Sequence, residues 1–166
     1  MKRFLLIITA LVLAFSVSSS AQGRFGVSGG MTFSEGNTLG HIGVTWQQKV
    51  AMGFSFQPSV LFNMKGMEGS QIGSVEVPVA VQWGPDLLLF RPYVEFVPYV
   101  GVNIFGEGVE PTKMECGFGL GGGLEIWKIQ VDARYNWNIN PYSRPVEYFP
   151  DGKGIGVTTL TFSILF

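Results

Sequence analysis

The charged residues of this chain that could do chemistry lie within apolar segments, at a spacing of two. Asp132 and Arg134, for example, alternate with apolar residues in IQVDARYNWN (129–138). Ionisable side chains at membrane depth are candidates for a proton or ion path. They can instead neutralise one another in a buried ion-pair network, and the width of the surrounding structure decides between the two. Six residues form this expected ion network, which would lie in the lumen of the barrel inferred below: Arg24, Arg91, Glu95, Glu125, Asp132 and Arg134.

Nucleophilic catalysis finds little support in the sequence. A histidine base must lie within hydrogen-bond reach of its nucleophile. His41 is the only histidine, and its neighbours Ile42 and Gly43 supply no nucleophile, although the distant Ser34 or Ser70 remain open as partners. We therefore predict that the protein is not an enzyme, and that His41 is solvated at the base of a loop. The alternative is an outer-membrane enzyme that modifies lipid.

Metal, cofactor and nucleic-acid sites are not expected either. One cysteine and one histidine cannot make a zinc site without several carboxylates. The glycines of GLGGGLE (119–125) have strand spacing and no following helix to bind phosphate. Without Lys2 and Arg3, the 11 basic residues fall to nine against 12 acidic ones, and no basic run is present to bind nucleic acid.

The N-terminus predicts export. Two cations precede the apolar run FLLIITALVLAF (4–15), and Ser19 and Ala21 stand at the small-residue positions of a signal peptidase site. The run is shorter than the ~20 residues that a membrane-spanning helix needs. We expect a signal peptide over 1–21, cleaved after Ala21, and one domain over 22–166.

The rest of the chain shows strand periodicity. Apolar residues recur with period two, and no segment keeps helical spacing for three turns. An all-β fold with eight antiparallel strands follows from this pattern. The expected strands are Arg24–Phe33, Leu39–Trp46, Gly53–Asn63, Gly73–Trp83, Arg91–Ile104, Glu115–Ile126, Ile129–Asn138 and Gly156–Phe166.

The connections predict an up-and-down barrel with two unlike ends. The longest, 105–114 and 139–154, fall at one end, and the two-residue turn Trp127–Lys128 falls at the other. Long outer loops and short inner turns are typical of outer-membrane barrels. The apolar run GPDLLLF (84–90) does not fit this rule, and the pattern gives it no place.

Aromatic residues indicate which face of the sheet points outward. One face is apolar and uncharged, and its phenylalanines and tryptophans would overfill the interior of an eight-stranded barrel. We therefore expect a transmembrane barrel whose apolar face meets lipid. The alternative is a soluble, secreted lipocalin-like barrel that binds an apolar ligand, with Phe54, Phe96 and Phe162 facing inward. The expected interfacial aromatics are Trp46, Trp83, Trp127, Trp137 and Phe166.

The glycines of GFGLGGGLEI (117–126) occupy alternate positions on one face of the expected sixth strand. A hairpin closed by Trp127–Lys128 places these glycines beside the polar side chains of the next strand. The inward face would then leave room for Arg134 to extend across the lumen. The expected pairs are Glu125 with Gln130, Gly123 with Asp132, and Gly121 with Arg134.

Four sequence features carry a resemblance to a known family. They are GLGGGLEIWKIQVDARYNWNINP (119–141), EVPVAVQW (76–83), FRPYVEFVPYVGV (90–102) and the terminal phenylalanine. The chain resembles the PorT-like outer-membrane β-barrel family of Gram-negative bacteria, small barrels of the OmpA/OmpX type. The resemblance implies an eight-stranded barrel inserted by the barrel-assembly machinery, and the C-terminal VTTLTFSILF resembles the signal that this machinery recognises. It implies no shared activity.

The sequence thus predicts an integral outer-membrane barrel with a filled polar lumen and no open pore, because a water channel needs about 16 strands. Its role would be structural or interaction-based, through the extracellular loops. Exposed aromatic and arginine side chains are typical contact residues. The 139–154 loop is therefore the candidate site for a protein partner, although a proline-stiffened cap without a partner is an equal alternative. The candidate contacts are Tyr142, Arg144, Tyr148 and Phe149.

Overall fold

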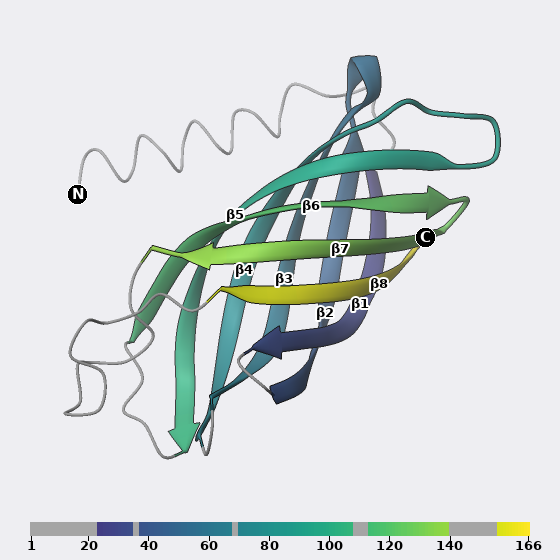
Figure 1. Cartoon of the computed structure of the whole chain (residues 1–166). Helices are drawn as coiled ribbons and strands as arrows, with labels where there is room; N and C mark the ends of the chain where they lie inside the picture. The colour runs from purple at the N-terminus through teal and green to yellow at the C-terminus, as the bar shows by residue number, and fades with distance from the viewer. Residues whose placement is uncertain (1–22, 35–36, 68–69, 108–112, 140–155) are drawn as a thin grey trace.

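The chain folds into one closed barrel of eight antiparallel strands (Figure 1). The computed structural model describes residues 23–34, 37–67, 70–107, 113–139 and 156–166. Each strand pairs with the next along the chain, and the last pairs with the first. The strands are β1 (Gly23–Ser34), β2 (Asn37–Lys49), β3 (Phe54–Met67), β4 (Ser70–Trp83), β5 (Arg91–Glu107), β6 (Met114–Ile126), β7 (Ile129–Asn138) and β8 (Val157–Leu165).

The expected strand order and topology are confirmed. The observed and expected strands differ mainly at their ends. Several observed strands are longer, because inward and outward side chains keep alternating into segments where we expected loops. The segment 64–72, expected to be a loop, is the main error: β3 runs to Met67 and β4 begins at Ser70. The expected signal peptide over 1–21 lies outside the described residues. No helix among the described residues is long and apolar enough to span a membrane.

Two kinds of turn connect strands at the end of the barrel shown at the top and right of Figure 1. A short 3-10 helix, η1 (Ala51–Gly53), joins β2 to β3 with positive φ angles at Met52 and Gly53. Trp127 takes a φ of 56° in the two-residue turn between β6 and β7. We call this end of the barrel the turn end, and the opposite end the loop end.

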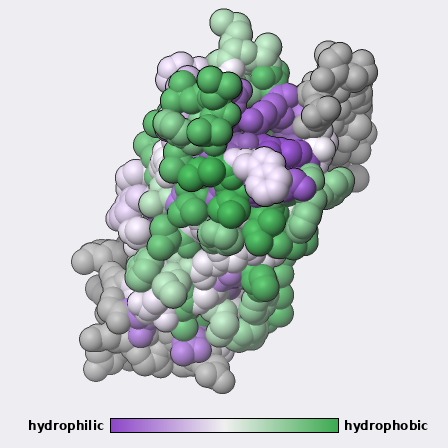
Figure 2. All heavy atoms as spheres, turned by 90° about the vertical axis from the view of Figure 1, so that its right-hand side faces the viewer, coloured by the Kyte–Doolittle hydropathy of each residue, from purple (hydrophilic) through white to green (hydrophobic). Residues whose placement is uncertain are grey.

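The apolar face of every strand lies outside the barrel. Phe54, Phe96 and Phe162, whose direction separates a membrane barrel from a soluble one, are 43%, 46% and 46% exposed. Hydrophobic residues also cover much of the face in Figure 2, where they border a hydrophilic patch. The expected outward direction of the apolar face is therefore observed, and the alternative of a soluble barrel with an apolar ligand inside is wrong, because those side chains do not line the lumen.

The glycines of β6 make room for bulky side chains inside the barrel, as expected. All three expected pairs of the β6–β7 hairpin are observed. A Cβ atom at Gly119 would lie 2.7 Å from Cδ of Arg134, and one at Gly123 would lie 2.5 Å from the hydroxyl oxygen of Tyr93. A Cβ atom at Gly117 would likewise meet Tyr99. The glycine face thus leaves room for Arg134 from β7, as expected. It also leaves room for Tyr93 and Tyr99 from β5, and the sequence pattern did not predict these two.

We predict that Gly123→Ala destabilises the barrel by about 1–3 kcal/mol, the usual cost of overpacking. The added methyl group would meet the Tyr93 hydroxyl and, at 2.4 Å, the backbone oxygen of Val131. Gly29→Ala is the matched control, because its Cβ atom would have no neighbour closer than 3.6 Å. Urea unfolding in detergent micelles measures both variants. Equal loss of stability in the two would show that space at Gly123 is not limiting.

Candidate functional site

The candidate site is the charged interior of the barrel. Every strand turns polar side chains inward, and the charged ones that form ion pairs lie in three groups along the lumen. We call them the turn-end cluster (Arg24, Lys49, Arg91, Glu125 and Asp86), the central pair (Glu95 with Arg134) and the loop-end cluster (Lys65, Glu76 and Glu115).

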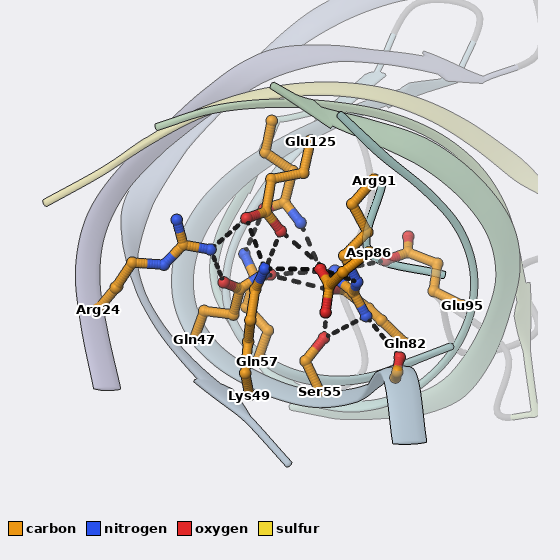
Figure 3. Close-up of polar contacts among 12 residues, drawn as sticks. Arg24, Gln47, Lys49, Ser55, Gln57, Gln82, Asp86, Arg91, Glu95 and Glu125 are labelled. Carbon is orange, nitrogen blue, oxygen red and sulfur yellow. Dashed lines mark hydrogen bonds and ion pairs between the residues drawn. The ribbon is translucent and has the colours of Figure 1, made fainter. Parts of the chain in front are cut away.

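One carboxylate organises the turn-end cluster. Glu125 has only 4% of its side chain exposed and pairs with cations from three strands (Figure 3). Arg24 of β1 contacts its Oε1 atom, and Nζ of Lys49 lies 3.2 Å from the same oxygen. Nη1 of Arg91 lies 3.4 Å from Oε2, which also accepts a hydrogen bond of 3.1 Å from Gln47. Both oxygens of Glu125 are therefore engaged.

Further contacts fix the cations of this cluster. Asp86, in the β4–β5 connection, accepts a hydrogen bond of 3.0 Å from Lys49 and lies 3.6 Å from Nε of Arg91. Nη2 of Arg91 donates to the carbonyl of Gly53 at 2.8 Å and to the hydroxyl of Ser55 at 3.0 Å. Three strands and two turns are thereby joined at one end of the lumen.

The central pair is looser than the turn-end cluster. Nη1 of Arg134 lies 3.7 Å from Oε1 of Glu95, and Gln82 donates to Oε2 at 3.3 Å. Asp132 is buried on the same face of β7 as Arg134, but no ion pair joins it to a cation in the described part of the chain. Five of the six expected network residues therefore form ion pairs, and Asp132 is brought into the same lumen without one.

Sequence reasoning missed the loop-end cluster. Nζ of Lys65 lies 2.5 Å from an oxygen of Glu76 and 2.5 Å from one of Glu115. Glu76 also accepts hydrogen bonds of 3.0 Å from Asn63 and from Ser74. Lys65 falls in the segment expected to be a loop, yet it lies in β3 two residues from the inward Asn63, and this spacing indicates an inward side chain.

The expectation of a solvated His41 is wrong. Its side chain is buried in the lumen, and Nδ1 lies 3.1 Å from the hydroxyl of Thr32. That hydroxyl in turn donates to Asn63 at 2.9 Å. Residue 41 stands at an inward position of β2, and its ring is therefore enclosed by the barrel.

Two small cavities lie within the lumen. One, of about 20 Å³, is next to the central pair, and the other, of about 10 Å³, is next to His41 and Glu76. A buried water needs about 10–15 Å³, so each cavity has room for about one water molecule. Among the described residues, no group of three or more His, Cys, Asp or Glu side chains could hold a metal ion.

The expected interfacial aromatics lie on the outside at both ends. Trp83, Trp127 and Phe166 are exposed at the turn end, where Trp46 is half-buried with its ring 6.4 Å from that of Phe25. Trp137 is nearer the loop end. It stacks on Phe118 at 5.4 Å and meets Tyr135 edge-on at 4.6 Å. The candidate loop contacts Tyr142, Arg144, Tyr148 and Phe149 lie outside the described residues.

Comparison with solved structures supports the fold. Neisserial surface protein A is 12% identical, with 89% of this chain and 98% of that chain covered at a TM-score of 0.55. The N-terminal β-barrel domain of Pseudomonas aeruginosa OprF is also 12% identical, with 89% and 100% covered at a TM-score of 0.53. Both are small eight-stranded outer-membrane barrels. This chain therefore has the fold of such barrels.

No protein-family model and no curated protein matches the chain. The resemblance to the PorT-like family stays a prediction, and identities of 12% carry the fold but no activity.

We predict that Glu125→Gln destabilises the barrel by about 3 kcal/mol, the lower part of the range for breaking a buried ion pair. The lower part applies because Arg24 and Lys49 reach solvent. Asp86→Asn is the control. It removes a carboxylate that is 58% exposed, and such pairs contribute at most about 1 kcal/mol. Urea titration in micelles compares the two, and a larger loss for Asp86→Asn would contradict the central role of Glu125.

Proposed function

We propose that the chain is an integral outer-membrane protein of a Gram-negative bacterium, with a structural or interaction role carried by its extracellular loops. The observation that carries this proposal is the inverted distribution of polarity. Charged side chains lie in the lumen, while an uncharged face bordered by aromatic residues surrounds the barrel. In water this arrangement would expose far more apolar surface than a soluble protein tolerates, whereas a bilayer matches it.

The last strand supports assembly by the barrel-assembly machinery. Leu160, Phe162, Ile164 and Phe166 point outward along β8 and its end. This pattern fits the C-terminal signal that the sequence resembles. Membership of the PorT-like family and export through a signal peptide over 1–21 are further parts of the proposal.

The interior supports a barrel without an open pore. Buried ion pairs occupy three levels of the lumen, and each cavity among them has room for only about one water molecule. We infer a stabilising role for the lumen network and no catalytic one, because His41 is enclosed with Thr32 inside the barrel and away from the lipid-facing surface.

Membrane insertion predicts a depth-dependent cost for a charge on the outer face. Leu120→Arg, in the middle of β6, should destabilise the barrel in lipid vesicles by about 2–4 kcal/mol. Met114→Arg, on the same face at the loop end of β6, should cost about 0–1 kcal/mol. Both side chains are well exposed, so neither change disturbs the lumen.

Denaturing gels of the wild type test the proposal further. Wild type should show a band that shifts on boiling after refolding with detergent or vesicles, and no such band after refolding in buffer alone. Folding in plain buffer, together with equal costs for Leu120→Arg and Met114→Arg, would reject the membrane assignment.

The enclosed lumen predicts negligible conductance. Wild-type protein inserted in a planar bilayer should give no steady single-channel steps, because the ion-pair clusters obstruct the axis. The comparison is the double variant Lys65→Ala/Arg134→Ala, which removes the cation of the loop-end cluster and the cation of the central pair. Steady channels in the wild type would rule out the closed lumen, while leaving the outer-membrane location intact.

A further inference from the structure

The apolar run GPDLLLF (84–90), which the strand pattern did not explain, forms the connection between β4 and β5. Leu87 donates a backbone hydrogen bond of 3.1 Å to the carbonyl of Phe90, which closes a turn. At its tip Leu88 is 105% exposed and Leu89 is 81% exposed. Consecutive exposed apolar residues are unfavourable in water unless they serve binding.

The base of this turn is fixed to the barrel. The amide of Gly84 donates to the carbonyl of Gly53 at 3.0 Å. A Cβ atom at Gly84 would lie 1.9 Å from the backbone oxygen of Pro92, so only glycine fits there. Asp86 reaches inward to the turn-end cluster, as described above. The leucines are therefore presented at the tip of an anchored turn.

Other exposed apolar residues lie at the same end of the barrel as the leucines. Trp83, the last residue of β4, lies on the outer face with its ring 6.5 Å from that of Phe54. The neighbouring turn η1 carries Met52, also strongly exposed, and the Gly84–Gly53 hydrogen bond joins the two turns. Figure 2 views this end of the molecule, where hydrophobic residues border the hydrophilic patch.

We propose that the β4–β5 turn, Leu87–Phe90, inserts into the boundary between headgroups and acyl chains of the leaflet at the turn end, and so anchors the barrel at a set depth. The inference rests on the proposed function. A lipid surface is the occupant that the structure favours, because the turn follows Trp83 of the apolar outer wall and its base is hydrogen-bonded to η1, which carries the exposed Met52. Trp127 at the same end, with Nζ of Lys128 5.6 Å from its ring centre, is typical of an interface.

Site-directed spin labelling tests this insertion. Cys116→Ala removes the only cysteine. Leu88→Cys or Leu89→Cys then accepts a nitroxide in the full barrel, refolded into phosphatidylethanolamine–phosphatidylglycerol vesicles and checked by its boiling shift. Leu120→Cys is the reference for the lipid-facing wall, and Lys113→Cys the reference for water at the loop end. Power saturation with oxygen and with a nickel chelate reports depth.

We expect the labels at Leu88 and Leu89 to collide more with oxygen than with nickel, at a depth between the two references. Nickel accessibility equal to that of Lys113, with Leu120 in lipid, would overturn the insertion alone and leave the barrel in the membrane. Spin–spin broadening that disappears on dilution with unlabelled protein would show that a second copy covers the turn, which also overturns it. Nickel access at Leu120 would reject the proposed function and the insertion together.

Discussion

The narrow lumen of an eight-stranded barrel is the constraint on which the rest of this structure depends. Such an interior is just wide enough for side chains, so every inward residue must fit against those of several other strands. Glycines on β6 have no side chain and so leave space for Arg134, Tyr93 and Tyr99. The charges that enter the space must then find partners within reach, because little water is available to solvate them.

Charge inside the barrel is balanced in number but unevenly distributed. The described interior holds Arg24, Lys49, Lys65, Arg91 and Arg134 against Glu76, Glu95, Glu115, Glu125 and Asp132. At the turn end, three cations surround one buried carboxylate, and Lys49 and Arg91 also contact the exposed Asp86. At the loop end two carboxylates face one cation, and beside the one-to-one central pair Asp132 adds a further carboxylate. The ion pairs link strands far apart in sequence, such as β1 with β6.

Strand periodicity predicted the fold well because one rule, alternation between faces, operates along every strand. It placed eight strands and their order, and it identified the inward direction of Arg134 and Glu125. The partners of these residues were harder to predict. Alternation does not show how far a strand extends, and for this reason Lys65 was assigned to a loop. It also gives no distance along the barrel axis, so the separation of Asp132 from any ion pair could not be foreseen.

The seam between β1 and β8 has a consequence for how this protein folds. Gly26 pairs with Leu165, so closure joins residues from opposite ends of the domain. Bringing them together carries a large loop-closure entropy, and contacts so distant in sequence form slowly. Until they form, β1 and β8 each present an unpaired backbone edge, which promotes aggregation in water and is not tolerated in hydrocarbon. For the membrane barrel proposed above, an open sheet is stable in neither solvent, and we expect closing of the seam to coincide with entry into the bilayer.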